Sequence, residues 1–73
     1  MNVKIEYCVV WNYDPQAASL AKAIENKFGI KPQLIQSGGG AFEVSIDGKK
    51  IFSKKETGRF PRNEEILEAI GKK

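Results

Sequence analysis

The sequence predicts a small α/β domain of two layers, in which a four-stranded mixed sheet carries both helices on one face. Two observations indicate this class. Apolar residues alternate with polar ones over residues 3–8 and 42–47, and they recur at helical spacing over residues 14–28. The predicted elements follow in the order β-α-β-β-β-α. With 73 residues, the chain is expected to form one domain, residues 1–73.

The first half of the chain has the pattern of a strand, a helix and a second strand. The alternation over residues 3–8 predicts a strand with one buried face, which ends where the alternation is lost at 9–11. Asp14 and Pro15 predict a helix start, with Asp14 as the N-cap and Pro15 at the first helical position. Gly29 is a natural stop for this helix. Residues 32–37 then predict a short second strand.

The second half predicts a β-hairpin. Phe42, Val44 and Ile46 alternate with polar residues and indicate a third strand. The Asp47-Gly48 pair is a strong signal for a tight turn, because glycine supplies the positive φ that such a turn needs. Residues 49–53 form the returning fourth strand.

The chain then enters a polar loop, residues 54–60, and a last helix that begins at Pro61 or Asn63 and ends at Ile70. A right-handed crossover makes the first two strands parallel neighbours, and the hairpin adds on the other side of the first strand. This topology brings three loops to one end of the sheet. They are residues 9–13, 38–41 and 54–61.

Composition excludes several classes of function. The formal charge is +3, but the two signs are interspersed and no basic stripe indicates nucleic-acid binding. No apolar run is long enough to span a membrane and no leader is recognisable, so we expect a soluble, cytoplasmic monomer. One cysteine and no histidine leave no disulfide framework, no metal site and no histidine-dependent catalysis.

Cys8 is the one residue whose position suggests chemistry, because it ends a strand where three loops meet. One interpretation is a nucleophilic thiol whose pKa is lowered by Lys54, Lys55 or Arg59. The other is that a lone cysteine serves as a small buried apolar residue. Position alone does not separate the two. The redox interpretation requires a sulfur atom that a second sulfur can approach.

Four segments resemble one family over nearly the whole chain. They are Tyr-Cys-Val-Val-Trp-Asn-Tyr (7–13), Gly-Gly-Gly-Ala-Phe-Glu-Val (38–44), Asp-Gly-Lys (47–49) and Ser-Lys-Lys-Glu-Thr-Gly-Arg-Phe-Pro (53–61). In this order and spacing they resemble the selenoprotein W-related (Rdx; SelT/SelW/SelH) family. The resemblance implies a thioredoxin-like fold and a Cys-x-x-Cys or Cys-x-x-selenocysteine motif after the first strand. It also implies a thiol or selenol oxidoreductase linked to glutathione and to cell redox homeostasis.

The chain departs from that pattern at the second motif position. Cys8 matches the first cysteine, but Trp11 stands where the second cysteine or selenocysteine belongs. If Trp11 is native, only monothiol chemistry is left, in which a mixed disulfide with glutathione or a partner-protein thiol is resolved by an external thiol. Alternatively, position 11 is selenocysteine in the natural gene, since the codon UGA is one base from a tryptophan codon.

The neighbouring residues also have two interpretations each. Trp11 is either a packing lid or a surface on which a ligand stacks. Gly38-Gly39-Gly40 lacks the residues of a phosphate-binding loop, so we interpret it as permissive backbone beside Cys8. The basic residues of the last loop are either solvated charges or groups that attract the carboxylates of glutathione. The expected docking residues are Val9, Val10, Gly39, Gly40, Phe42, Lys54, Arg59 and Phe60.

The predicted function is therefore a redox protein without a bound cofactor or metal, with glutathione as co-substrate. The alternative is a non-catalytic interaction module on the same fold. In that case Trp11 would add to an exposed apolar contact site with Val9, Val10 and Phe60.

Overall fold

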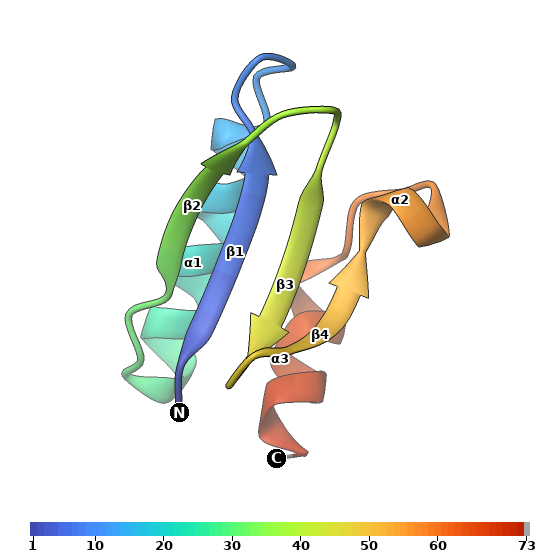
Figure 1. The fold of residues 1–73 in the computed structure, drawn as a ribbon. Coiled ribbons are helices and arrows are strands. Elements are labelled where there is room, and N and C mark those ends of the chain that lie inside the picture. Colours follow the sequence, from blue (N-terminus) through green and yellow to red (C-terminus); the bar gives the residue numbers. More distant parts are fainter. Residues whose placement is uncertain (73) are drawn as a thin grey trace.

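The computed structural model describes residues 1–72 and contains one four-stranded sheet of order β2-β1-β3-β4 (Figure 1). Strand β1 is parallel to β2 and antiparallel to β3, and β3 is antiparallel to β4. The predicted topology is confirmed. The elements are β1 (Val3–Cys8), α1 (Asp14–Phe28), β2 (Gln33–Ser37), β3 (Phe42–Ile46), β4 (Lys49–Ser53), α2 (Lys54–Thr57) and α3 (Asn63–Gly71).

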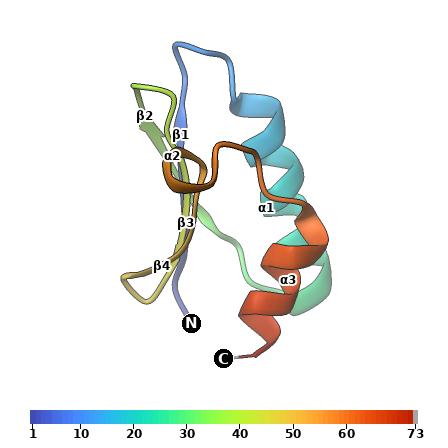
Figure 2. The same cartoon turned by 90° about the vertical axis from the view of Figure 1, so that its right-hand side faces the viewer.

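The two long helices, α1 and α3, cover the same face of the sheet (Figure 2). The alternation of the central strands explains this layer, because every second side chain of β1 and β3 points toward the helices. The core consists of apolar side chains from both layers, each less than a tenth exposed. Its members are Val3, Ile5, Tyr7, Ala17, Leu20, Ile24, Phe42, Val44, Ile46, Phe52, Ile66 and Ile70.

The hairpin turn forms where the sequence predicts it. Asp47 and Gly48 both have positive φ, 52° and 86°, which is the backbone shape of the turns that match the twist of paired strands. The turn also holds the N-terminal end of the sheet. The backbone N–H of Asn2 donates to the Asp47 carboxylate at 2.8 Å, and the backbone N–H of Asp47 donates to the Asn2 carbonyl at 2.8 Å.

Two local predictions are wrong. The N-cap of α1 is Tyr13 and not Asp14, which is the first helical residue. The reason is that the N–H of Tyr13 is already bound to the Cys8 carbonyl at 3.1 Å, while the Tyr13 carbonyl accepts the first helical hydrogen bond, from Ala17 at 3.1 Å. The polar loop after β4 contains one helical turn, α2, which ends at Gly58 in the left-handed conformation.

The second strand begins at Gln33, one residue after the predicted start. None of the helices within residues 1–72 has both the length and the apolar character needed to cross a membrane.

Candidate functional site

The carboxyl end of β1 is hydrogen-bonded to both neighbouring loops. The N–H of Cys8 donates to the Ala41 carbonyl at 2.8 Å, and the N–H of Val9 donates to the Ser37 carbonyl at 3.1 Å. Figure 1 shows the loops after β1 and β2 at the same end of the sheet. The third loop joins them, because Lys55 Nζ lies 3.7 Å from the point where a Cβ at Gly39 would be. The predicted meeting of the three loops is confirmed.

The loop after β1 folds back on Cys8. The N–H of Asn12 donates to the Val9 carbonyl at 3.1 Å, and Asn12 itself has a positive φ of 64°. This turn places the N–H of Trp11 3.4 Å from Cys8 Sγ, as a donor to the sulfur atom. A backbone donor in this position can hydrogen-bond a thiolate as well as a thiol.

Cys8 is buried, with 0% of its surface exposed. The prediction of an accessible sulfur atom is therefore wrong for this conformation. Ala41, whose carbonyl binds the Cys8 N–H, is also buried at 3% exposure. Neither residue belongs to the core cluster between sheet and helices. The geometry thus matches the interpretation of Cys8 as a small buried apolar residue, with one polar contact at its sulfur.

Trp11 and Val10 lie on the surface above this buried thiol. They are 61% and 79% exposed. The indole of Trp11 lies against Gly40, where a Cβ would come within 2.9 Å of its ring carbon Cζ3. It also meets Tyr13 edge-on, with ring centroids 6.3 Å apart. Trp11 therefore packs on the loop on one side only, and its exposed side leaves the ligand-stacking interpretation open.

A cluster of three aromatic rings continues from Tyr13 toward the core. The Phe60 ring lies 4.6 Å from Tyr13 and 5.3 Å from Phe42, both edge-on and measured between centroids. Lys54 Nζ lies 5.5 Å from the Tyr13 ring centroid and 5.3 Å from that of Phe60, in cation–π range. Phe42 is only 1% exposed, so it supports the site from the core.

Arg59 forms a two-pronged ion pair with Glu65, at 2.6 and 3.1 Å. This hydrogen bonding by Arg59, together with the backbone N–H of Arg62, lowers the pKa of Glu65 to about 2. The guanidinium of Arg59 is thereby paired within the chain. Of the other basic residues of this loop, Lys54 lies over the Tyr13 ring and Lys55 approaches Gly39.

The predicted site residues differ in burial. Those exposed are Val10, Trp11, Gly39 and Arg59, those half-buried are Val9, Lys54 and Phe60, and those buried are Cys8, Gly40 and Phe42. The central packing position of Tyr13 and the roles of the Ser37 and Ala41 carbonyls were not predictable from the sequence pattern. Backbone acceptors leave no side-chain signal in a sequence. Within residues 1–72, no three side chains of metal-binding type lie close enough together to hold an ion.

Comparison with solved structures supports this fold. A selenoprotein W-related protein from Vibrio cholerae superposes with a TM-score of 0.86 and 26% sequence identity, over 92% of this chain and 88% of that one. A protein from Bordetella parapertussis shares the fold, with a TM-score of 0.92 and 22% identity over 97% of this chain and 94% of that one. The fold is thioredoxin-like, as the resemblance implied.

Curated relatives are similar over nearly the whole length of this chain. The mouse and bovine proteins named migration and invasion enhancer 1 are each 35% identical over 71 residues, which is 96% of this chain. The chain spans 62% of the length of these relatives. The sequence profile of the Rdx family matches residues 2–72. The chain therefore belongs to the Rdx family.

Proposed function

We propose that this chain is a thiol redox protein in which Cys8 reacts after the loop of residues 9–12 opens. The observation that carries the proposal is the N–H of Trp11 directed at Cys8 Sγ at 3.4 Å. Because Cys8 is buried, the closed conformation of this loop keeps the thiol unreactive. Membership of the Rdx family supports a redox role in general terms.

The proposed chemistry is an exchange between a thiol and a disulfide. The Cys8 thiolate attacks one sulfur of a disulfide, forms a mixed disulfide with it, and releases the other sulfur as a thiolate that takes up a proton. The chain contains no second cysteine, so an external thiol must displace Cys8 from the mixed disulfide. We propose glutathione or a partner-protein thiol as that group. A single free cysteine suits a reducing compartment such as the cytoplasm.

We further propose that position 11 is a cysteine or selenocysteine site in the natural lineage of this chain. The backbone nitrogen of residue 11 lies 3.4 Å from Cys8 Sγ. The Cα of residue 11 is bonded to this nitrogen at about 1.5 Å, so a side chain there starts close to the sulfur. The codon in the natural gene decides this point. A UGA codon followed by a selenocysteine-insertion element, or a cysteine codon, supports the proposal, and a UGG codon contradicts it.

The redox proposal is tested by the rate at which Cys8 reacts with an aromatic disulfide such as dithiodipyridine, followed at increasing urea concentration below the unfolding transition. If the loop opens locally, the rate stays nearly constant with urea, because local opening exposes little surface. If Cys8 reacts only after global unfolding, the rate rises with urea in proportion to the unfolding equilibrium, and the proposal fails. The Trp11→Cys variant should gain a disulfide with Cys8 that a dithiol reductant reverses.

A second candidate function is a non-catalytic interaction module, and the exposure of Val10 and Trp11 favours it. Exposed tryptophan side chains often anchor protein interfaces. Two substitutions separate the candidates. Cys8→Ser abolishes thiol exchange and preserves an interaction through Trp11, whereas Trp11→Ala weakens that interaction and preserves the thiol.

A further inference from the structure

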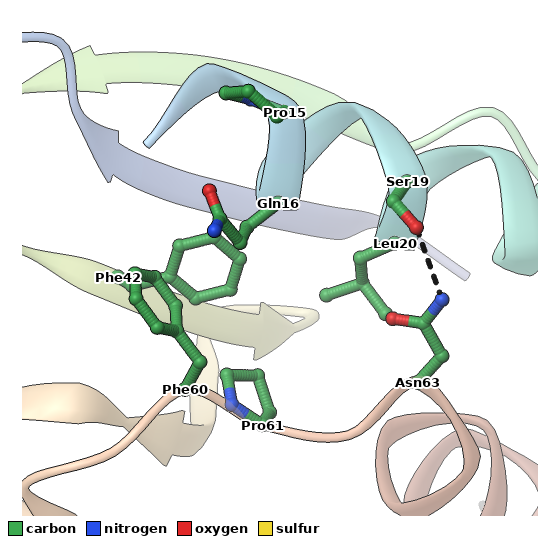
Figure 3. A pocket seen from close by; sticks show the side chains of 8 residues that line it. All are labelled: Pro15, Gln16, Ser19, Leu20, Phe42, Phe60, Pro61 and Asn63. Carbon is green, nitrogen blue, oxygen red and sulfur yellow. Dashed lines mark hydrogen bonds between the residues drawn. The ribbon is translucent and has the colours of Figure 1, made fainter. Parts of the chain in front are cut away.

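A pocket of about 210 Å³ lies between α1 and the segment that leads into α3, beyond the aromatic cluster (Figure 3). Helix α1 forms one wall, the segment from Phe60 to Asn63 forms the other, and Phe42 of β3 closes the floor. Asn63 Nδ2 donates to Ser19 Oγ at 3.3 Å and links the two walls. The lining residues are Pro15, Gln16, Ser19, Leu20, Phe42, Phe60, Pro61 and Asn63.

The lining of this pocket carries no charged side chain, although 29% of the residues in the chain are charged. Leu20 and Phe42 lie at its base and are each only 1% exposed, so the accessible apolar surface comes from the half-buried rings of Phe60 and Pro61. A carboxylate or phosphate would lose its hydration there without gaining a cation, so electrostatics disfavours an anionic ligand. The uncharged lining therefore favours a neutral, apolar group.

The rim of the pocket has a different chemistry from its floor. Gln16, Ser19 and Asn63 bring amide and hydroxyl groups, which are neutral donors and acceptors of hydrogen bonds. These are the groups that satisfy the N–H and C=O of a peptide backbone. Pockets that enclose whole small-molecule ligands are commonly about 300–1,000 Å³, so the volume here suits one large side chain.

We propose that this pocket binds one neutral apolar side chain, of leucine or phenylalanine size, from a partner polypeptide whose backbone contacts the rim. The occupant is identified by the uncharged lining, the single-side-chain volume and the peptide-like polarity of the rim. The proposal is independent of the redox chemistry of Cys8. It describes a site on the helix side of the domain that the chemistry of Cys8 does not require.

The test is an NMR titration of the full 73-residue chain with blocked amino acids. N-acetyl-phenylalaninamide and N-acetyl-leucinamide should shift amide signals of residues 15–20 and 60–63, with dissociation constants on the order of millimolar, as expected for ligands this small. The charged analogues N-acetyl-aspartamide and N-acetyl-lysinamide should bind at least about tenfold more weakly. Equal shifts with the charged analogues, shifts centred elsewhere, or none at all would overturn the proposal.

Three variants make the test specific. Ser19→Phe places a ring at the pocket mouth, and Gln16→Glu places a charge on its rim. Both positions are exposed, so the fold should be retained. Each should weaken binding of the neutral probes, Ser19→Phe by at least about tenfold because the space is filled. Gln36→Glu on the exposed part of β2 is the matched control and should bind as the parent chain does. Unchanged binding in both pocket variants would contradict the site.

Discussion

Gly40 is the residue on which the closed form of the site depends most directly. Its φ is +74°, a conformation that side chains with a Cβ rarely adopt. A Cβ there would also approach the indole of Trp11 to 2.9 Å. Two separate costs therefore meet at one position, one from the backbone and one from the packing of Trp11.

We expect Gly40→Ala to destabilise the fold by more than the roughly 1–2 kcal/mol that a left-handed conformation costs a residue with a Cβ. The displaced indole accounts for the excess. Because the chain has one tryptophan, its fluorescence emission reports the displacement directly. Urea unfolding followed by this emission measures both effects.

Gly29→Ala is the control for this experiment. Gly29 has a similar φ of +70°, but a Cβ there would meet nothing within 4 Å. It should lose stability through the backbone term alone and keep the parent emission spectrum. Equal losses in the two variants, with an unshifted spectrum for Gly40→Ala, would show that the packing of Trp11 on Gly40 is unimportant.

At the scale of elements, the start of α3 is held by one carboxylate. Glu65 accepts two hydrogen bonds from the Arg59 guanidinium, at 2.6 and 3.1 Å, and one from the backbone N–H of Arg62 at 2.9 Å. The N–H of Glu65 donates in return to the Arg62 carbonyl at 3.1 Å. This reciprocal arrangement fixes the segment after α2 to the first turn of α3.

The stability of the protein should therefore depend on the ionisation of Glu65. Its pKa is lowered from 4.5 to about 2, first by the hydrogen bonds from Arg59 and then by the backbone of Arg62. A lowered carboxyl pKa adds stability that is fully present above pH 4.5 and is lost as the pH falls toward 2. The pKa of Glu43 is lowered in the same direction, by Lys50 and then Ser53, so the parent chain alone cannot isolate Glu65.

Comparison with Glu65→Gln isolates this contribution. The parent chain should be more stable than the variant at neutral pH, and the difference should shrink between pH 4.5 and 2. Urea unfolding at a series of pH values measures the difference. Added salt should reduce it, because the pair lies on the surface. A difference that stays constant across this pH range would contradict the assignment.

The short elements are the ones that the sequence pattern predicts poorly. The single turn of α2 spans four residues and has no buried side chain, so it has no apolar periodicity to detect. It forms because the Thr57 hydroxyl donates to the Ser53 carbonyl at 3.0 Å and Gly58 ends the turn with an N–H to the Lys54 carbonyl at 2.7 Å. By contrast, the long periodic segments were placed within one residue.

At the scale of the whole molecule, Phe42 connects the core to the surface features. It lies opposite Tyr7 in the β1–β3 register, is 1% exposed, and supports the Phe60 ring and the floor of the neutral pocket. Both the aromatic cluster and the pocket therefore depend on a residue that belongs to the hydrophobic core.

We expect Phe42→Ala to cost about 3–5 kcal/mol, the usual range for removing a buried ring. A domain of 73 residues has a total stability of roughly 4–11 kcal/mol, so this single change should leave the fold marginal. Urea unfolding gives the loss. Val10→Ala removes an apolar side chain that is 79% exposed and should change stability by no more than about 0.5 kcal/mol. Similar losses in the two variants would contradict the assignment of Phe42 to the core.

The order of the strands and helices, the hairpin turn and the family likeness were determined by the sequence, because alternation and helical spacing are local properties of neighbouring residues. The accessibility of Cys8 was decided only by the tertiary structure. The Ala41 and Ser37 carbonyls, which accept from the N–H groups of Cys8 and Val9, come from about thirty positions further along the chain and leave no side-chain signal. The availability of the Arg59 charge was also decided by the tertiary structure, because the guanidinium is paired with Glu65 of the following helix. Burial and pairing depend on what the fold brings together, and a pattern along one strand does not contain that information.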